Sequence, residues 1–341
     1  MGQQITKDKR VRVGVAGAGK MGQNHIRVLN ELNNIFELVG IYDPDTSKSS
    51  IAEKYGVKYF RDYTELLKSV DAVTLPCPTS LHKEMALSAA NMGVHALVEK
   101  PMAETMDDAA EIYRAFCRKN LRLTVGYVER FNPVVQAIAD IVKDMEIVAV
   151  EVHRCSPFDS RIYDVDVVTD LMIHDLDIVL NALNLGKIKK CSAIGKKVYT
   201  TQFADYASAT LSFENGVIAT ITTSRSTEDK IRKLCIHAKG AYIEGDLLNR
   251  TLLIKRGTNY LEDVRAASIK YKQSSITEQV VLPNIEPLKV EMSSFGMAIV
   301  DCIDPVVRAE QVIETMGVLD TIKKNIYDEM KGEHCDEGSI S

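Results

Sequence analysis

The sequence predicts an α/β domain with a parallel, doubly wound sheet, followed by an α+β domain with a large, mainly antiparallel open sheet. A glycine-rich turn, Gly17–Gly22, joins a strand to a helix near the N-terminus. Strand-like and helix-like segments then alternate, which is typical of parallel βαβ units with right-handed crossovers. In the second half, turn signals such as Glu214-Asn215-Gly216 separate consecutive strand-like segments, which is typical of an antiparallel meander.

The length and composition are those of a globular protein with two domains. The chain has 341 residues, of which 45% are hydrophobic and 26% are charged. We place the first domain at residues 1–127, the second domain at residues 128–331, and a disordered tail at residues 332–341. The net charge of −5 shows no basic bias, so we expect no nucleic-acid partner.

The cysteines and the apolar runs predict the location of the protein. Seven scattered cysteines without a C-x-x-C pair favour reduced thiols over a disulfide framework or a zinc site, so we expect no metal. The first residues are polar, and no run approaches the roughly 18 apolar residues that span a bilayer. We therefore expect a cytoplasmic protein without a membrane partner.

The glycine-rich turn carries the first chemical signal. It lies between the strand Val11–Ala16 and a helix pattern, which is the context that a dinucleotide-binding (Rossmann) motif requires. The first glycine allows a tight turn, the second lets the backbone approach a pyrophosphate, and the third permits close packing of helix and strand. The phosphates would lie at the helix N-terminus. The cofactor-binding residues predicted in this turn are Gly17, Gly19, Lys20, Met21 and Gly22.

Asp43 is predicted to select the cofactor. It follows the strand Phe36–Tyr42 and lies 21 residues after Gly22, counted as 43 − 22. A spacing of about 20 is expected for the acid that binds the adenosine ribose. The carboxylate would repel the 2′-phosphate of NADP, so we expect NAD, with NADP less favoured. The alternative is a simple turn former, because Asp43-Pro44-Asp45 is turn-like.

Two further strand ends supply candidate residues. The strand Asp71–Leu75 runs into Pro76-Cys77-Pro78-Thr79, and Thr79 or Ser80 is expected to cap the following helix. Pro76, Thr79 and His82 are predicted near the cofactor, with a plain surface histidine as the alternative for His82. The strand His95–Val98 runs into Glu99-Lys100-Pro101, where proline ends the strand because it has no N–H to donate.

Lys100 is the first candidate catalytic residue and is also predicted to contact the cofactor. Ligands bind outside the carboxyl ends of strands in such sheets, and Lys100 would lie there. The alternative for an isolated Glu-Lys-Pro tripeptide is a solvated lysine. Glu99 is expected either to accept a hydrogen bond from the nicotinamide ribose or to hold Lys100 in place.

The second half carries a candidate catalytic pair and a large sheet. Within a helical pattern at residues 168–184, Asp170 and His174 fall on the same face, together with Asp177 and Asn181. An aspartate can orient a histidine, which is suited to proton transfer near neutral pH; the alternative is the solvated side of the helix. The predicted strands include Ser192–Tyr199, Tyr206–Phe213, Val217–Ser224 and Leu234–Ala238. One face of this sheet needs a cover, so we expect a homodimer or homotetramer interface there.

Over nearly its whole length the sequence resembles the Gfo/Idh/MocA oxidoreductases. The resemblance rests on Gly17–Gly22, on Glu99-Lys100-Pro101 and on the Asp170-x-x-x-His174 pair. It implies a Rossmann domain followed by an open-sheet substrate domain, and it implies Lys100, Asp170 and His174 as the catalytic set. Family members mostly oxidise or reduce a secondary alcohol on a sugar, a cyclitol or a sugar nucleotide. The loop Pro76–Thr79 departs from the Thr-Pro-Asn type that is usual in the family.

The segment Gly126–Pro133 resembles the stretch found in one subgroup of the family, the UDP-N-acetylglucosamine 3-dehydrogenases. Arginines can present paired donors to a diphosphate, with surface salt bridges as the alternative. The predicted substrate contacts are Arg130, Asn132, Arg154, Arg161 and His174. The favoured reaction is hydride transfer between the sugar-nucleotide 3-hydroxyl and nicotinamide. A dehydrogenase of free sugars or inositol and a non-catalytic NAD-binding regulator stay as alternatives, and the sequence leaves open whether Lys100 or His174 is the general base.

Overall fold

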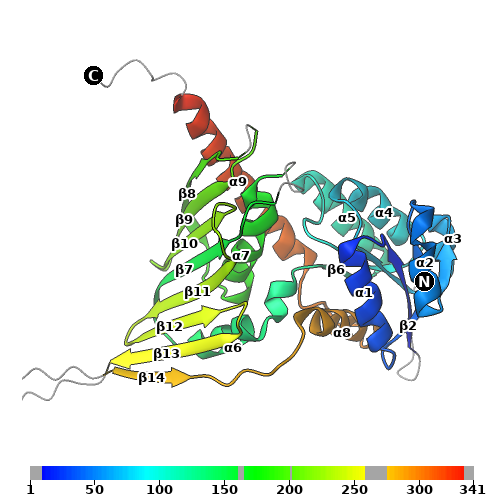
Figure 1. Cartoon of the computed structure of the whole chain (residues 1–341), viewed down its shortest axis with the longest axis horizontal. Helices are drawn as coiled ribbons and strands as arrows, with labels where there is room; N and C mark the ends of the chain where they lie inside the picture. The colour runs from blue at the N-terminus through cyan, green and yellow to red at the C-terminus, as the bar shows by residue number, and fades with distance from the viewer. Residues whose placement is uncertain (1–9, 160–164, 200–201, 258–274, 334–341) are drawn as a thin grey trace, which may run out of the picture. The chain divides into compact units, whose positions relative to one another are not determined.

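The first sheet holds six parallel strands in the order β3-β2-β1-β4-β5-β6. Figure 1 labels β2 and β6 of this sheet. The structure is a computed structural model that describes residues 10–159, 165–199, 202–257 and 275–333. The strands of this sheet are β1 (Val11–Ala16), β2 (Phe36–Tyr42), β3 (Lys58–Phe60), β4 (Ala72–Leu75), β5 (His95–Val98) and β6 (Leu123–Val125). The helices that connect them are α1 (Lys20–Glu31), α2 (Ser49–Tyr55), α3 (Tyr63–Lys68), α4 (Thr79–Asn91) and α5 (Met106–Lys119). The strand order is that of a Rossmann fold, which confirms the predicted fold class.

The strand register brings four loops to the same edge of this sheet. β1 pairs with β4, β4 with β5, and β5 with β6, and all of them run in the same direction. The loops that follow these strands therefore begin side by side. Their first residues are Gly17, Pro76, Glu99 and Gly126. The candidate cofactor and catalytic residues of the first domain thus come from neighbouring strand ends, as the sequence predicts.

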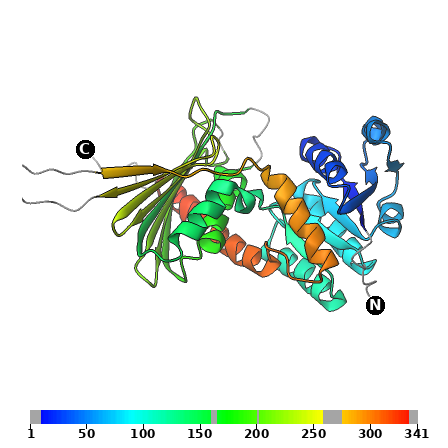
Figure 2. The same ribbon diagram turned by 90° about the horizontal axis from the view of Figure 1, so that it is seen from below.

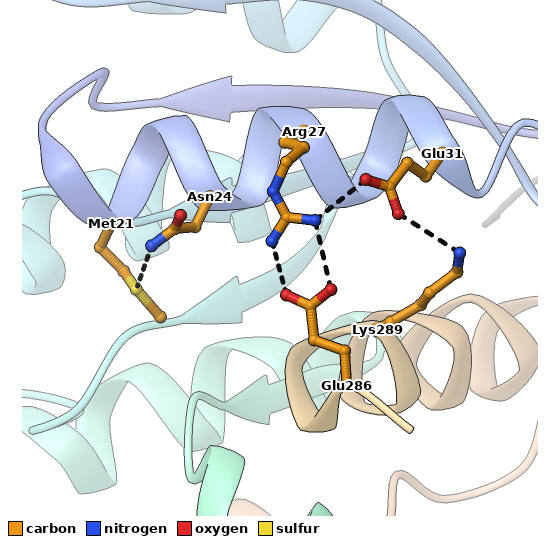
Figure 3. A network of polar contacts seen from close by, with 6 residues as sticks. All are labelled: Met21, Asn24, Arg27, Glu31, Glu286 and Lys289. Atoms are coloured by element: carbon orange, nitrogen blue, oxygen red, sulfur yellow. Dashed lines mark hydrogen bonds and ion pairs between the residues drawn. The ribbon is translucent and has the colours of Figure 1, made fainter. Parts of the chain in front are cut away.

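Helix α8 (Pro287–Val300) packs with the first sheet although the chain reaches it only after the second sheet. Its buried side chains, Leu288, Met292, Phe295 and Ile299, share a core cluster with β1 and α1. Figure 3 shows the polar contacts that join α8 to α1. Arg27 donates to Glu286 at 2.5 and 3.2 Å, and Lys289 lies 3.3 Å from Glu31.

The chain therefore folds into two compact units, and the first is discontinuous in sequence. It comprises Met1–Phe131 and Ile285–Gly317, and the second comprises Asn132–Asn284 and Val318–Ser341. The sequence interpretation placed every residue from 128 to 331 in the second domain. Periodicity could not assign α8, because its apolar face is equally suited to either core. The domain boundaries stay a prediction.

His95, at the start of β5, makes the stability of the first unit sensitive to acid. The backbone N–H of Arg122 donates to its Nδ1 at 2.8 Å, so the proton of the neutral ring is on Nε2. Burial, aided by the charge of Arg122 and opposed by that of Asp71, lowers the pKa of His95 to about 4. Protonation would also remove the acceptor that Arg122 uses.

We expect acid to destabilise the first unit through His95. Because the folded pKa lies below the unfolded value of about 6.5, the contribution is complete above that pH and is lost as the pH falls toward 4. The loss is on the order of 3 kcal/mol. Urea unfolding at about pH 7 and about pH 4.5 measures it, and His95→Asn, which keeps an acceptor near Nδ1, should lose less. Equal acid losses in the two proteins would contradict this assignment.

The second sheet has eight strands in the order β14-β13-β12-β11-β7-β10-β9-β8. All neighbours are antiparallel except β10 and β7, which run parallel, so the predicted mainly antiparallel sheet is confirmed. The strands are β7 (Ile147–Cys155), β8 (Ile188–Lys196), β9 (Tyr206–Phe213), β10 (Ile218–Ser224), β11 (Ile231–Ala238), β12 (Ala241–Asp246), β13 (Thr251–Gly257) and β14 (Ser275–Gln279).

Helices cover one face of the second sheet (Figure 2). Gly245 on β12 leaves room for α6 (Pro133–Val142), because a Cβ there would lie 2.7 Å from Val134. Gly195 on β8 similarly leaves room for Ile326 on α9 (Ala309–Glu333). The opposite face carries small hydroxyl side chains on β8, β9 and β10, of which Ser192 and Thr210 are exposed. This face is the open face on which the predicted homo-oligomer interface would lie.

The helix that carries the candidate pair Asp170 and His174 is irregular. A π-helical turn, η3 (Val168–Met172), leads into α7 (Ile173–Asp177), and a second π-helical turn, η4 (Ile178–Ala182), follows. The sequence predicted regular helical spacing over this stretch. The π turns were not predictable because they alter the backbone bonding without changing the apolar pattern. π turns inside helices occur frequently at functional sites.

Candidate functional site

The glycine-rich turn has the geometry that a dinucleotide requires. Gly17 has φ of 112°, and a Cβ there would lie 2.9 Å from the carbonyl oxygen of Pro76 in the next loop. At Gly22 a Cβ would lie 1.9 Å from the carbonyl oxygen of Gly17, so only glycine fits. At Gly19 a Cβ would meet nothing within 4 Å. The turn is therefore closed toward the protein at Gly17 and Gly22 and open at Gly19.

The N-terminus of α1 can accept an anion. Its N-cap is Gly19, no side chain caps it, and its first turn holds no acidic residue. The backbone N–H groups and the helix dipole there favour a phosphate. Lys20 is exposed, and the thioether of Met21 accepts a contact from Asn24 at 3.9 Å (Figure 3). The backbone N–H groups of this helix end and the ammonium group of Lys20 could hold the diphosphate of a dinucleotide.

Asp43 lies beside the glycine-rich turn. Its Oδ2 accepts a hydrogen bond from the backbone N–H of Ala18 at 2.6 Å, and its Oδ1 accepts one from Asp45 at 2.9 Å. A carboxylate has about four acceptor positions, so capacity remains for ribose hydroxyls. Asp43 is thus both the predicted turn former and a residue placed at the cofactor-binding turn.

His82 joins the loops that follow β4 and β5. It lies in the first turn of α4 and is 1% exposed, with Nδ1 2.9 Å from the Pro101 carbonyl and Nε2 3.0 Å from the Cys77 carbonyl. A surface histidine is therefore excluded. Burial lowers the pKa of His82, against the raising effects of both carbonyls and of Glu99.

The loop Pro76–Thr79 differs in detail from the prediction. Helix α4 begins at Thr79 with Pro78 as its N-cap and without a side-chain cap, so the predicted cap by Thr79 or Ser80 is wrong. Proline is suited to this position because it has no N–H to leave unpaired. Burial raises the pKa of the Cys77 thiol to about 11, which keeps it protonated at neutral pH.

Glu99 and Lys100 follow β5, and a buried histidine that the sequence interpretation missed lies beside them. Glu99 Oε1 is 3.0 Å from Nε2 of His25, and Glu99 Oε2 accepts from the backbone N–H of Lys100 at 3.3 Å. Lys100 itself is half-buried. His25 is fully buried on the apolar face of α1. A histidine among Ile26 and Leu29 was the available signal, because a buried polar side chain needs a partner.

In the second unit, Asp170 is paired with a buried arginine. Arg225 donates to Asp170 Oδ2 at 3.2 Å and to the Val165 carbonyl at 2.8 Å. The Arg225 side chain is 3% exposed and that of Asp170 is 26% exposed. Arg225 comes from the loop after β10 and was not predicted. His174 lies one helical turn after Asp170 and is half-buried.

Asp177 and Asn181, which share the predicted stripe with Asp170 and His174, contact each other. Asn181 Nδ2 donates to Asp177 Oδ1 at 3.1 Å, and Asp177 is 1% exposed. This end of the stripe is therefore a polar pair in which Asp177 is buried and Asn181 is half-buried. The predicted solvated side does not apply to it.

Comparisons with known proteins agree with this geometry. Residues 11–127 match the family described as "Oxidoreductase family, NAD-binding Rossmann fold", and residues 146–244 match its C-terminal domain. UDP-N-acetylglucosamine 3-dehydrogenase from Acidithiobacillus ferrooxidans is 32% identical over 245 residues, which is 72% of this chain and 76% of that protein. The chain belongs to the GFO/IDH/MocA oxidoreductase family. The predicted family and its NAD cofactor are thereby confirmed.

A solved structure and a further relative are also similar to this GFO/IDH/MocA protein. A solved structure of the Acidithiobacillus ferrooxidans enzyme has a TM-score of 0.83 and 27% identity, and the match covers 93% of this chain and 98% of that chain. Inositol 2-dehydrogenase from Rubrobacter xylanophilus is 30% identical over 177 residues, which is 50% of this chain and 51% of that enzyme. In the described part of the chain, no helix is long and apolar enough to cross a membrane, and no group of three metal-ligating side chains occurs.

Arg154, a predicted substrate contact in this GFO/IDH/MocA protein, forms a buried ion pair. Its guanidinium donates to both carboxylate oxygens of Asp175 at 2.8–2.9 Å, and the side chains are 3% and 1% exposed. Asp175 lies 21 residues further along the chain, on α7. This buried ion pair between β7 and α7 gives Arg154 a structural role, and its predicted contact with the substrate stays a prediction.

Removing the Arg154 side chain is expected to destabilise the second unit. Arg154→Met removes the cation that contacts both oxygens of the buried Asp175 carboxylate, and breaking a buried ion pair costs about 3–5 kcal/mol. Urea unfolding measures the loss. Lys143→Met is the matched control, because Lys143 forms an exposed ion pair with Asp140 and should change stability by less than about 1 kcal/mol. Unchanged stability together with a raised KM in Arg154→Met would contradict this structural role and support the predicted substrate contact.

Two other predicted substrate residues also have structural partners. Arg130 is 7% exposed and donates to Gln311 at 2.8 Å and to the Val306 carbonyl at 3.3 Å. Asn132 caps α6, accepting from the Val134 N–H, and donates to the Leu247 carbonyl. These contacts hold both side chains within the protein, and their contact with the substrate stays a prediction. Arg161 lies outside the described residues.

Proposed function

We propose that the protein is an NAD-dependent dehydrogenase that acts on a secondary alcohol of a sugar nucleotide, with the 3-hydroxyl of UDP-N-acetylglucosamine favoured. The observation that carries this proposal is the similarity to a UDP-N-acetylglucosamine 3-dehydrogenase in both sequence and fold over most of the chain. The segment Gly126–Pro133, which suggested the same substrate, lies at the end of β6 beside the Lys100 loop.

Lys100, Asp170 and His174 are the proposed catalytic set. NAD, when bound, supplies the hydride acceptor. The substrate hydroxyl must lose its proton as hydride leaves, and His174 is proposed as the base, with Lys100 polarising the oxygen. Asp170, held by Arg225, is proposed to orient His174. A buried arginine keeps the charge of Asp170 compensated, which suits a carboxylate that orients a histidine.

Isotope transfer tests the reaction. UDP-N-acetylglucosamine with deuterium at C3 should give deuterated NADH, detected by mass spectrometry, while deuterium at C4 should stay in the sugar. UDP-glucose, glucose 6-phosphate and inositol are tested in parallel, each with NAD+ and NADP+. Turnover of a free sugar or inositol, without turnover of the nucleotide sugars, would favour a dehydrogenase of free sugars or inositol. NAD binding without oxidation of any tested alcohol would favour a non-catalytic NAD-binding regulator.

The general base is tested by the pH dependence of kcat/KM in Lys100→Met and His174→Asn. The variant that lacks the base should lose the acidic limb of the rate profile, because that limb reports deprotonation of the base. Full turnover in both variants would refute the proposed catalytic set.

We also propose that two copies associate through the open face of the second sheet. Thr210 on β9 lies between Ser192 and Thr220 on the neighbouring strands, and small side chains let two sheets approach closely. Thr210→Arg is expected to dissociate the homodimer or homotetramer, measured as molar mass by light scattering. An unchanged mass would place the interface elsewhere.

A further inference from the structure

The Glu99 carboxylate is buried at the point where α1, β5 and β6 meet. Glu99 is 8% exposed and His25 is 0% exposed. Its two oxygens have different partners: Oε1 faces Nε2 of His25 at 3.0 Å, and Oε2 accepts from the Lys100 backbone N–H at 3.3 Å. A buried carboxylate is costly unless such donors surround it.

Gly126, the first residue after β6, provides the space for this carboxylate. A Cβ at Gly126 would lie 2.8 Å from Cδ and from Oε1 of Glu99 and 2.9 Å from Oε2. Real Cβ atoms do not approach other atoms so closely, so any larger residue would displace the carboxylate. The strand pairing of β5 with β6 fixes this approach, because Val98 pairs with Val125.

We propose that Glu99 is a positioning residue that fixes the backbone at Lys100, and that His25 and Gly126 hold its carboxylate in place. The proposal rests on the proposed catalytic role of Lys100. It assigns Glu99 to the protein interior and not to the ribose of the cofactor. His82 holds the next residue of the same loop through the Pro101 carbonyl at 2.9 Å. The loop is therefore held on both sides of Lys100.

Substitution of His25 separates positioning from cofactor binding. His25→Leu removes the donor to Glu99, and a shift of about 1 Å in a catalytic group lowers the rate by about 100-fold. We expect that loss in kcat, with the dissociation constant of NAD changed less than about threefold. His25→Gln, which places an N–H near the position of Nε2, should recover most of the rate. A dominant loss of NAD affinity in Glu99→Gln would instead indicate a ribose contact and overturn the proposal.

A double-mutant cycle tests the role of Gly126. Gly126→Ala should lower kcat/KM by about 100-fold when Glu99 is present and change it less than about threefold in the Glu99→Ala background. Gly257→Ala is the control for an added methyl group, because a Cβ there meets nothing within 4 Å. Equal effects of Gly126→Ala in both backgrounds would overturn the proposal.

Amide exchange at Lys100 tests the proposal without any substrate. Its N–H donates to Glu99, so hydrogen–deuterium exchange at this amide should accelerate by about tenfold or more in His25→Leu. An unchanged exchange rate overturns the positioning role whatever the turnover. Accelerated exchange in a protein that oxidises no alcohol supports the positioning role and counts only against the proposed function.

Discussion

Lys100→Met is expected to lower kcat by about 10³-fold, the range for loss of a group that transfers or stabilises a proton. Met keeps much of the side-chain length while removing the ammonium group. NAD affinity, measured by calorimetry, should change little, because the glycine-rich turn and Asp43 are untouched. The expected result is therefore a protein that binds NAD with unchanged affinity and oxidises its substrate about 10³-fold more slowly.

The control for Lys100→Met is another lysine of the same unit. Lys83 forms ion pairs with Asp108 at 2.5 Å and Glu111 at 2.8 Å on the surface, so Lys83→Met should leave kcat unchanged. Turnover of Lys100→Met within about tenfold of the unmodified protein would contradict a catalytic role for Lys100.

Gly22→Ala is expected to prevent folding of the first unit. Its Cβ would lie 1.9 Å from the Gly17 carbonyl oxygen, and neither backbone segment can move without opening the turn. The destabilisation should exceed about 4 kcal/mol, measured by urea unfolding or seen as a loss of folded protein.

Gly19→Ala is the matched control within the same turn. A Cβ there meets nothing within 4 Å and the backbone φ is −67°, so stability should change by less than about 1 kcal/mol. The added methyl group would instead stand where the pyrophosphate approaches, and the dissociation constant of NAD should rise about tenfold or more. Equal stability losses in the two variants would contradict the distinction between the closed and open sides of the turn.

The Rossmann domain could be predicted because its signals are local. The glycines of the turn, the apolar strands and Asp43 all lie within a short stretch of the sequence. The alternation of strand-like and helix-like segments was sufficient to predict the strand ends that Pro76 and Glu99 follow. The parallel order of the sheet then placed them together.

A residue's partner could not be predicted where the two lie far apart in the chain. Arg154 is predicted as a substrate contact, and only the tertiary fold shows that its guanidinium pairs with the buried Asp175. His25 was missed because its partner, Glu99, lies 74 residues away. Arg225 was missed for the same reason, since Asp170 lies 55 residues before it.

The return of α8 to the first core has a consequence for synthesis on the ribosome. Domains generally fold as units during translation, the N-terminal one first. Here the first unit requires Ile285–Gly317, so its core is incomplete until the second sheet has been made. Leu288, Met292 and Phe295 would cover apolar side chains such as Ile26 only at that late stage. A fragment that ends at Phe131 should therefore aggregate, whereas one in which a short linker joins Phe131 to Ile285 should remain folded.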